Sequence, residues 1–397
     1  MLGILVTVFF VILAQDARAV SNEFSLDINS DFLTYTDCKD CGGRTSSKIN
    51  LKQKIIISHA VKCLAEVQSN HYSLYSHKVE SNVTEMNPGD FFCSYKTSSF
   101  VFTLGYTSIE WSQNIGPQIT DFFSAHDYRY TPFAGPRFRY SQPVLKIDYF
   151  SKFANLSLFA STKPHFNEYD LTSLYNLGFP IENEKQKAFQ KFDYGLRLSQ
   201  QLGAFDVSLS GLSLQDRDFQ PFFDLAVSKI FLKHETFQSY GLGITSEFLG
   251  GILRFDYQSI QNRQMIYNNF KNLPVNENAF AVGIDSPTLL NTIFSIQYSK
   301  IAPVEKDLPL LIEPIKEFLI LNANYSTSVK LSIEMTGLMN LKDQSKALKI
   351  DLAWPGNTYV DLHLGGESFS GEKNKSLDSY LDQTRVFLGV SAQISNP

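Results

Sequence analysis

Apolar and polar residues alternate in short stretches along most of this chain. Residues 192–199 read FDYGLRLS and residues 329–335 read VKLSIEM. A period of two residues predicts β-strands with one apolar face and one polar face. No helical period recurs with comparable regularity. The same alternation is present at residues 145–149, 156–161, 205–210, 253–258, 280–285, 348–352, 360–364 and 386–394.

The connections between these stretches alternate in length. Outer-membrane β-barrels show this asymmetry, with short periplasmic turns and long extracellular loops. We therefore predict an all-β fold, a transmembrane antiparallel β-barrel of about 14–18 strands, with 16 preferred. A secreted β-sandwich or solenoid is the alternative. Short links lie near 153–154, 202–203, 286–288, 326–327 and 355–356, and longer polar links at 111–141, 163–188, 261–277, 301–316, 337–346 and 366–382.

Composition agrees with a barrel and excludes some other classes. Aromatic residues make up 14% of the 397 residues, and a barrel uses them on its lipid face and at its two membrane interfaces. After residue 20, no apolar run is long enough for a transmembrane helix. The net charge of −5 gives no basic excess, so we expect no nucleic-acid partner.

The N-terminus resembles an export signal. Residues 1–13, MLGILVTVFFVIL, form an apolar run, and Ala17 and Ala19 occupy the small-residue positions before a cleavage site. We predict a signal peptide over 1–19 and a barrel over 20–397, in the bacterial cell outer membrane. A buried N-terminal helix is the alternative for the apolar run.

Charged residues stand at the polar positions of the alternation. An Arg or Lys on the lipid face would cost about 2–4 kcal/mol at mid-membrane, so these side chains must face a wet lumen or one another. We predict that they line a pore, since about 16 strands leave room for water unless loops fill the barrel. Alternatively, they pair across neighbouring strands inside a closed barrel. The predicted pore-lining residues are Lys146, Asp148, Asp193, Arg197, Asp206, Arg254, Asp256, Asp285, Lys330, Glu334, Lys349, Asp351 and Asp361, together with His363.

A long aromatic and charged connection follows the stretch Phe100–Ile109. Such a connection could fold into the lumen and form a constriction, and its aromatic and Arg side chains could contact a solute. An ordinary exposed loop is the alternative. The candidate constriction residues are Trp111, Asp121, Asp127 and Arg129.

Residues 104–127 carry a resemblance to one known group of proteins. Leu104-Gly105-Tyr106-Thr107, Trp111-Ser112, Asp121 and Asp127 resemble a pattern in porin-like barrels related to alginate-export proteins. Thr107 stands where that pattern has Gln, and Ser112 where it has Gly. The resemblance implies a single-chain barrel with a role in export or uptake.

Four cysteines lie in the first quarter of the chain: Cys38, Cys41, Cys63 and Cys93. Export would place them in an oxidising compartment, so we expect disulfides, with more than one pairing open. The Cys38-Lys39-Asp40-Cys41 motif could instead bind zinc or act in redox chemistry, and free thiols are a further alternative. We expect the disulfide bridges to brace residues 37–97. This segment could form a loop or a plug of the barrel.

Motifs for catalysis are lacking. The sequence has no HExxH, no GxSxG, no P-loop and no dinucleotide fingerprint, and His363 with Ser368 is a weak pair for an enzyme acting on lipids. We expect no enzyme activity, no cofactor and no metal. The function predicted is a porin-like channel for passive passage of small polar solutes, surrounded by outer-membrane lipid, with a homo-oligomer possible. The alternative is a closed structural or adhesive barrel whose long extracellular loops bind a partner.

Overall fold

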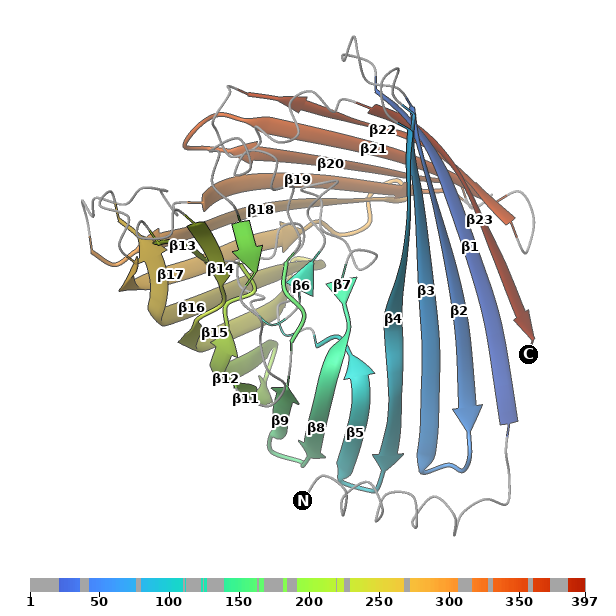
Figure 1. Ribbon diagram of the computed structural model, residues 1–397. Helices are drawn as coiled ribbons and strands as arrows, with labels where there is room; N and C mark the ends of the chain where they lie inside the picture. Colours follow the sequence, from blue (N-terminus) through green and yellow to red (C-terminus); the bar gives the residue numbers. More distant parts are fainter. Residues whose placement is uncertain are drawn as a thin grey trace.

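Strands dominate the structure (Figure 1). Within the described residues, no helix is long and apolar enough to cross a membrane. The predicted signal peptide, 1–19, lies outside these residues. The computed structural model describes residues 21–35, 43–75, 80–109, 111, 123, 125–126, 139–162, 164–167, 181–183, 191–218, 220–224, 229–267, 272–305, 316–327, 331–355, 360–371 and 385–396.

The main sheet has 18 strands, and every neighbouring pair in it is antiparallel. These strands are β1 (Ser21–Tyr35), β2 (Gly43–Ile56), β3 (Val61–Tyr75), β4 (Glu80–Lys96), β5 (Phe100–Thr107), β8 (Gln142–Phe150), β9 (Asn155–Thr162), β11 (Phe192–Leu202), β12 (Phe205–Gln215), β15 (Thr236–Phe248), β16 (Gly251–Ile266), β17 (Asn272–Asp285), β18 (Thr292–Pro303), β19 (Lys316–Ser326), β20 (Ser332–Asn340), β21 (Lys346–Pro355), β22 (Val360–Ser370) and β23 (Arg385–Asn396).

The first and last strands complete the ring. β1 pairs with β2 and also with β23, from Phe24 opposite Asn396 to Tyr35 opposite Arg385. Every strand of the sheet thus has two neighbours, although in the described ladders residues 80–88 of β4 pair with β3 and not with β5. The predicted antiparallel barrel is confirmed. Its 18 strands lie within the predicted range but exceed the preferred 16.

Turn lengths divide the barrel into a short-turn end and a long-loop end. β11 and β12, for instance, are joined by Gly203 and Ala204 only, whereas β9 and β11 are separated by residues 163–191. The polar link expected at 261–277 is mostly strand, because β16 continues to Ile266 and β17 begins at Asn272. The alternation fails there because the register between these strands shifts between Ile260 and Arg263.

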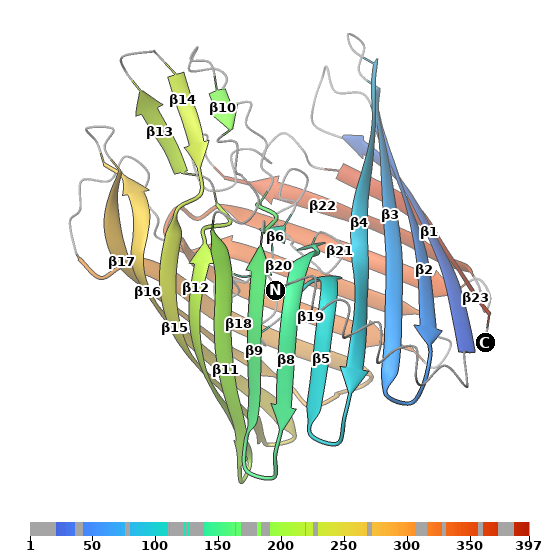
Figure 2. The ribbon, with the colours of Figure 1, turned by 60° about the horizontal axis from the view of Figure 1, so that its bottom comes forward.

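Two small sheets form within the long connections. β6 (Ala125–His126) pairs with β7 (Arg139–Tyr140), both between β5 and β8. β14 (Lys229–Lys233) pairs with β13 (Gln220–Asp224) and also, in parallel, with β10 (Ile181–Asn183). In both ribbon views, β6 lies inside the ring of strands (Figure 1, Figure 2).

The segment 37–97 is not a loop or plug where the structure describes it. It supplies β2, β3 and β4 to the barrel wall. Successive polar residues, such as Thr45-Ser46-Ser47-Lys48, hide the period of two in these strands. This explains why the sequence underestimates the strand count.

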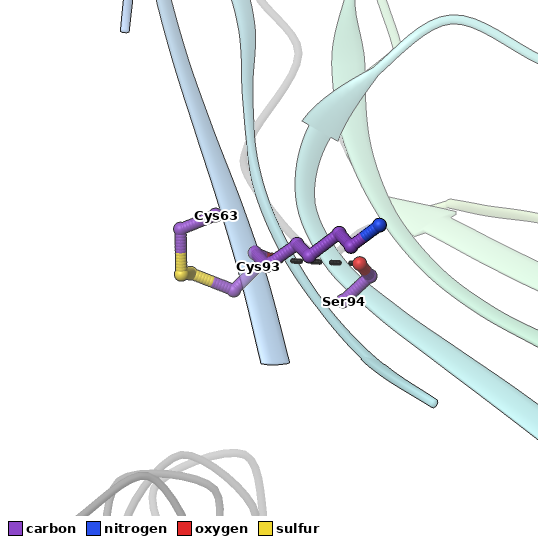
Figure 3. The surroundings of a disulfide bond; sticks show 4 residues. Cys63, Cys93 and Ser94 are labelled. Atoms are coloured by element: carbon purple, nitrogen blue, oxygen red, sulfur yellow. Dashed lines mark hydrogen bonds between the residues drawn. A yellow bond between two sulfur atoms is a disulfide. The ribbon is translucent and has the colours of Figure 1, made fainter. Parts of the chain in front are cut away.

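A disulfide joins β3 to β4, as expected for two of the four cysteines. Cys63 and Cys93 lie directly opposite each other, with 4.0 Å between their Cα atoms (Figure 3). Beside them, the Ser94 hydroxyl donates a hydrogen bond to the Lys62 carbonyl over 3.4 Å. The expected disulfide-forming Cys38 and Cys41 lie outside the described residues.

Candidate functional site: the inner face of the barrel

The register identifies the inner and outer faces of the wall. Tyr194, Leu196 and Leu198 on β11 are exposed apolar side chains and belong to the outer face. Asp193 and Arg197 alternate with them and therefore point inward. Residues directly opposite on neighbouring strands share a face, so each ladder extends this assignment to the next strand.

The predicted pore-lining positions fall on the inner side of this register. Lys330 lies outside the described residues, and Asp361 is placed only by its backbone position opposite Ser391. The others that share the inner face are Lys146, Asp148, Asp193, Arg197, Asp206, Arg254, Asp256, Asp285, Glu334, Lys349, Asp351 and His363. Whether they line a water-filled path stays a prediction.

Several of these charges pair along the wall. Lys146 Nζ lies 2.9 Å from Asp148 Oδ2, and the Ser157 hydroxyl donates to Asp148 Oδ1 over 2.6 Å. Arg254 binds both carboxylate oxygens of Asp285.

A second paired group lies on β21 and β22. Asp351 lies 3.7 Å from Lys349 Nζ and 3.6 Å from His363 Nδ1. In each of these pairs, the two partners lie on the same strand or on adjacent strands.

A buried ion pair lies near the long-loop end. Arg217, just after β12, donates to Asp193 Oδ2 over 2.6 Å, and the exposed fractions of the two side chains are 3% and 0%. Arg217 also donates to the carbonyl oxygens of Phe123 and Gln215, at 2.9 Å each. Asp193 further accepts the backbone N–H of Gln215. These hydrogen bonds compensate for removing both charges from water.

A second arginine, Arg263 on β16, binds three carboxylates. Its Nε donates to Asp216 Oδ2 over 2.6 Å, and its Nη2 donates to Asp216 Oδ1 over 3.0 Å. The same guanidinium reaches Asp218 at 2.9 Å and Glu277 at 3.3 Å. This fork-on-carboxylate geometry is the strong form of the Arg–carboxylate contact.

Sequence reasoning missed both arginines. Arg217 follows an alternating stretch within the run Asp216-Arg217-Asp218, and Arg263 lies where the alternation breaks. The run of three charged residues immediately after a strand was the one available signal. The partners of these arginines are distant in the sequence, so periodicity could not identify them.

The connection between β5 and β8 packs against the inner wall. The Phe123 ring lies 4.3 Å and the Trp111 ring 5.0 Å from the Phe159 ring, measured between centroids. Phe123 also lies 5.5 Å from the Arg217 guanidinium carbon. Trp111 therefore lies against the inner wall, and its role in a constriction stays a prediction. The candidates Asp121, Asp127 and Arg129 fall outside the described residues. The buried apolar cluster around these rings comprises Ile109, Phe123, Val144, Phe159, Leu212, Leu214, Phe237, Ile260, Ala279 and Ile301.

Hydrogen bonds connect three of the long connections. Asn167, between β9 and β11, accepts the backbone N–H of His126 over 2.7 Å and donates to Asp218 over 2.7 Å. His234, between β14 and β15, donates from Nδ1 to the Asp216 carbonyl and stacks on Phe166. Burial lowers the pKa of His234, although the hydrogen bond to Asp216 opposes that shift.

Glycine is required at one position of the segment that resembles alginate-export barrels. Gly105 has a φ of 142°, and a Cβ atom there would overlap the Phe91 carbonyl oxygen and the Phe92 Cα of the adjacent strand.

Among the described residues, no group of three or more His, Cys, Asp or Glu side chains is placed to bind a metal.

Solved structures resemble this barrel along nearly its whole length. OccK8 (OprE) of Pseudomonas aeruginosa gives a TM-score of 0.55 at 10% identity, covering 95% of this chain and 98% of that chain. The chain has the porin-like fold of bacterial outer-membrane β-barrels. OccK7 (OpdD) of the same organism gives 0.53 at 9% identity, covering 95% and 99%. OccAB3 of Acinetobacter baumannii gives 0.51 at 11% identity, also covering 95% and 99%.

No protein-family model and no curated protein matches the chain. The predicted porin-like fold is confirmed, and it agrees with the predicted location in the bacterial outer membrane. The alginate-export resemblance stays a prediction.

Proposed function

We propose that the chain is a passive channel for small polar solutes in the bacterial outer membrane. The observation that carries this proposal is a ring of 18 strands with a charged and polar inner face. Barrels of 16–18 strands are wide enough to hold an aqueous channel, whereas about eight strands enclose a space that side chains fill. The exposed apolar side chains of the outer face would contact lipid.

The inner charges pair within one strand or between adjacent strands, as the closed-barrel alternative predicts, but such pairing fits an open lumen equally well. Lys146 with Asp148 and Lys349 with Asp351 are neighbours along one strand, and Arg254 with Asp285 joins adjacent strands. Such pairs lie against the wall and need no partner from the opposite side. Passing solutes would exchange water for these polar groups, and the described part of the β5–β8 connection would narrow the path from one side.

Conductance across a planar bilayer tests the channel. Refolded protein should insert in discrete current steps, and the same protein denatured by boiling should give none. A bilayer that stays silent although folded protein is present would contradict the channel.

Ion selectivity gives a second measurement. Eight of the thirteen predicted pore-lining charges are acidic, so a salt gradient should reveal a modest cation preference. Asp206→Asn, near the short-turn end, should reduce that preference without preventing insertion.

A closed adhesive barrel is the second candidate. The network around Arg217 and Arg263 favours it, because it fastens the β5–β8, β9–β11 and β12–β15 connections together at one end. Such a barrel would give no conductance. It would bind a partner surface, and replacement of the long connections would remove the binding.

A further inference from the structure

Large apolar side chains project from the turns on one side of the short-turn end. Phe153 in the β8–β9 turn, Leu249 in the β15–β16 turn and Leu290 in the β17–β18 turn have exposed fractions of 81%, 83% and 93%. Between them, Leu202 and Phe205 flank the β11–β12 turn and are also exposed. The four turns are consecutive around the ring, along the lower edge in Figure 2. We call these five side chains the apolar rim.

Two of the rim leucines occupy backbone conformations that leucine disfavours. Leu249 and Gly250 have φ values of 51° and 74°, and Leu290 and Asn291 have 50° and 62°. Hairpin turns with positive φ at both central residues prefer Asn-Gly, and a bulky residue there is a true outlier. Each leucine therefore carries a conformational cost, and its exposed side chain gains little packing within the chain to offset it.

The tips of the other described turns at this end carry no large apolar side chain, although the exposed Phe100 flanks the β4–β5 turn. The β2–β3 turn exposes His59, the β4–β5 turn exposes Ser98, and the β19–β20 turn begins at exposed Ser326. The Ser58 and Thr97 hydroxyl oxygens stabilise the first two turns by accepting hydrogen bonds from the backbone N–H groups of Ala60 and Phe100. Among the described turns, the apolar tips are thus confined to the side from β8 to β18.

The rim continues the lipid-facing surface of the barrel. Leu202 and Phe205 lie opposite each other, and Phe205 shares the outer face with exposed Leu209 on β12. Phe248 extends the exposed apolar surface of β15 to Leu249 at the turn. Lys152, next to Phe153, is exposed. Its ammonium group could lie among the lipid phosphates while its aliphatic stem lies along apolar surface.

We propose that the apolar rim is a lipid-docking surface, inserted into the membrane leaflet at the short-turn end. The barrel then sits deeper on the β8–β18 side, and burial in lipid offsets the backbone cost of the two leucines. The proposal requires the barrel to lie in a membrane, but it does not depend on whether the lumen conducts.

Single-tryptophan variants test the depth of the rim. In a Trp111→Phe, Trp354→Phe background, Leu290→Trp and Leu249→Trp are each folded into phosphatidylcholine vesicles containing lipids brominated near the headgroup end of the acyl chain. Ser98→Trp, at a polar tip of the same end, is the matched control. We expect quenching at positions 249 and 290 to exceed that at 98 by at least about twofold, because interfacial apolar groups sit at that depth.

Equal quenching at all three positions would overturn the proposal. Strong quenching of the 249 and 290 variants by aqueous iodide, without quenching by bromolipid, would also overturn it. That result would place the rim in water, where it could bind a protein partner instead of lipid. Phe153→Trp provides a further rim position if either leucine variant fails to fold, as judged by gel migration with and without boiling. Conductance of the same variants reports on the channel separately.

Discussion

At the scale of single residues, the contact between Arg217 and Asp193 makes the strongest prediction. Arg217→Met leaves a carboxylate fully buried without its cation, which costs about 3–5 kcal/mol in comparable pairs. The free energy of unfolding in urea should fall by about this amount. In detergent micelles, the fraction of folded protein at each urea concentration can be measured from the different gel migration of the folded and unfolded forms.

The matched control removes both charges. Arg217→Met combined with Asp193→Leu should recover most of the lost stability, because replacing a whole buried pair by apolar residues is often neutral. An unchanged urea midpoint in the single variant would contradict the buried pair.

His234 makes stability depend on pH. Its folded-state pKa lies below the ordinary 6.5, so the unfolded chain takes up the proton first as the pH falls. The contribution of neutral His234 is complete above pH 6.5 and is lost as the pH falls toward the lowered value. The slope due to this one group is at most about 1.4 kcal/mol per pH unit.

His234→Gln isolates that effect, because the amide can still donate to the Asp216 carbonyl but does not titrate. Urea midpoints of both proteins should be measured between about pH 7.5 and about pH 5. We expect the wild-type protein to lose more stability than the variant over this range. Parallel loss in the two proteins would mean that other groups cause the pH dependence.

At the scale of elements, the disulfide restrains the β3–β4 hairpin. It closes a loop with a sequence separation of 30 residues, for which the chain-entropy model gives about 3–4 kcal/mol. Cys63→Ser with Cys93→Ser should lower the urea midpoint accordingly. Reductant should lower the midpoint of the wild-type protein more than that of the double variant, which keeps Cys38 and Cys41. A double variant as stable as the wild type would show that strand pairing alone holds this hairpin.

The same elements show how far sequence patterns reach. Alternation identified β11 and β12 because each has one apolar and one polar face, a property of a few neighbouring residues. It failed in β2, β3 and β4, where successive polar residues break the period, and around Arg263, where the register shifts. These strands are held by pairing with their neighbours, which depends on residues far away in the chain.

At the scale of the whole molecule, the complete ring predicts resistance to detergent. Every strand has a neighbour on each side, so unfolding must break backbone pairing all around the ring. Unboiled protein from an outer-membrane fraction should therefore migrate differently from boiled protein on a denaturing gel. Identical migration of the two samples would contradict the barrel.

The sequence by itself determined the strand class, the antiparallel barrel and the inner or outer side of the charges that lie in regularly alternating stretches. These follow from the period of two, which is set locally by the pleat of the backbone. Only the tertiary structure decided that 18 strands form the ring, that Arg217 meets Asp193, and that Phe123 packs on Phe159. Each depends on chain segments brought together by register and loop closure, and no local pattern encodes such contacts.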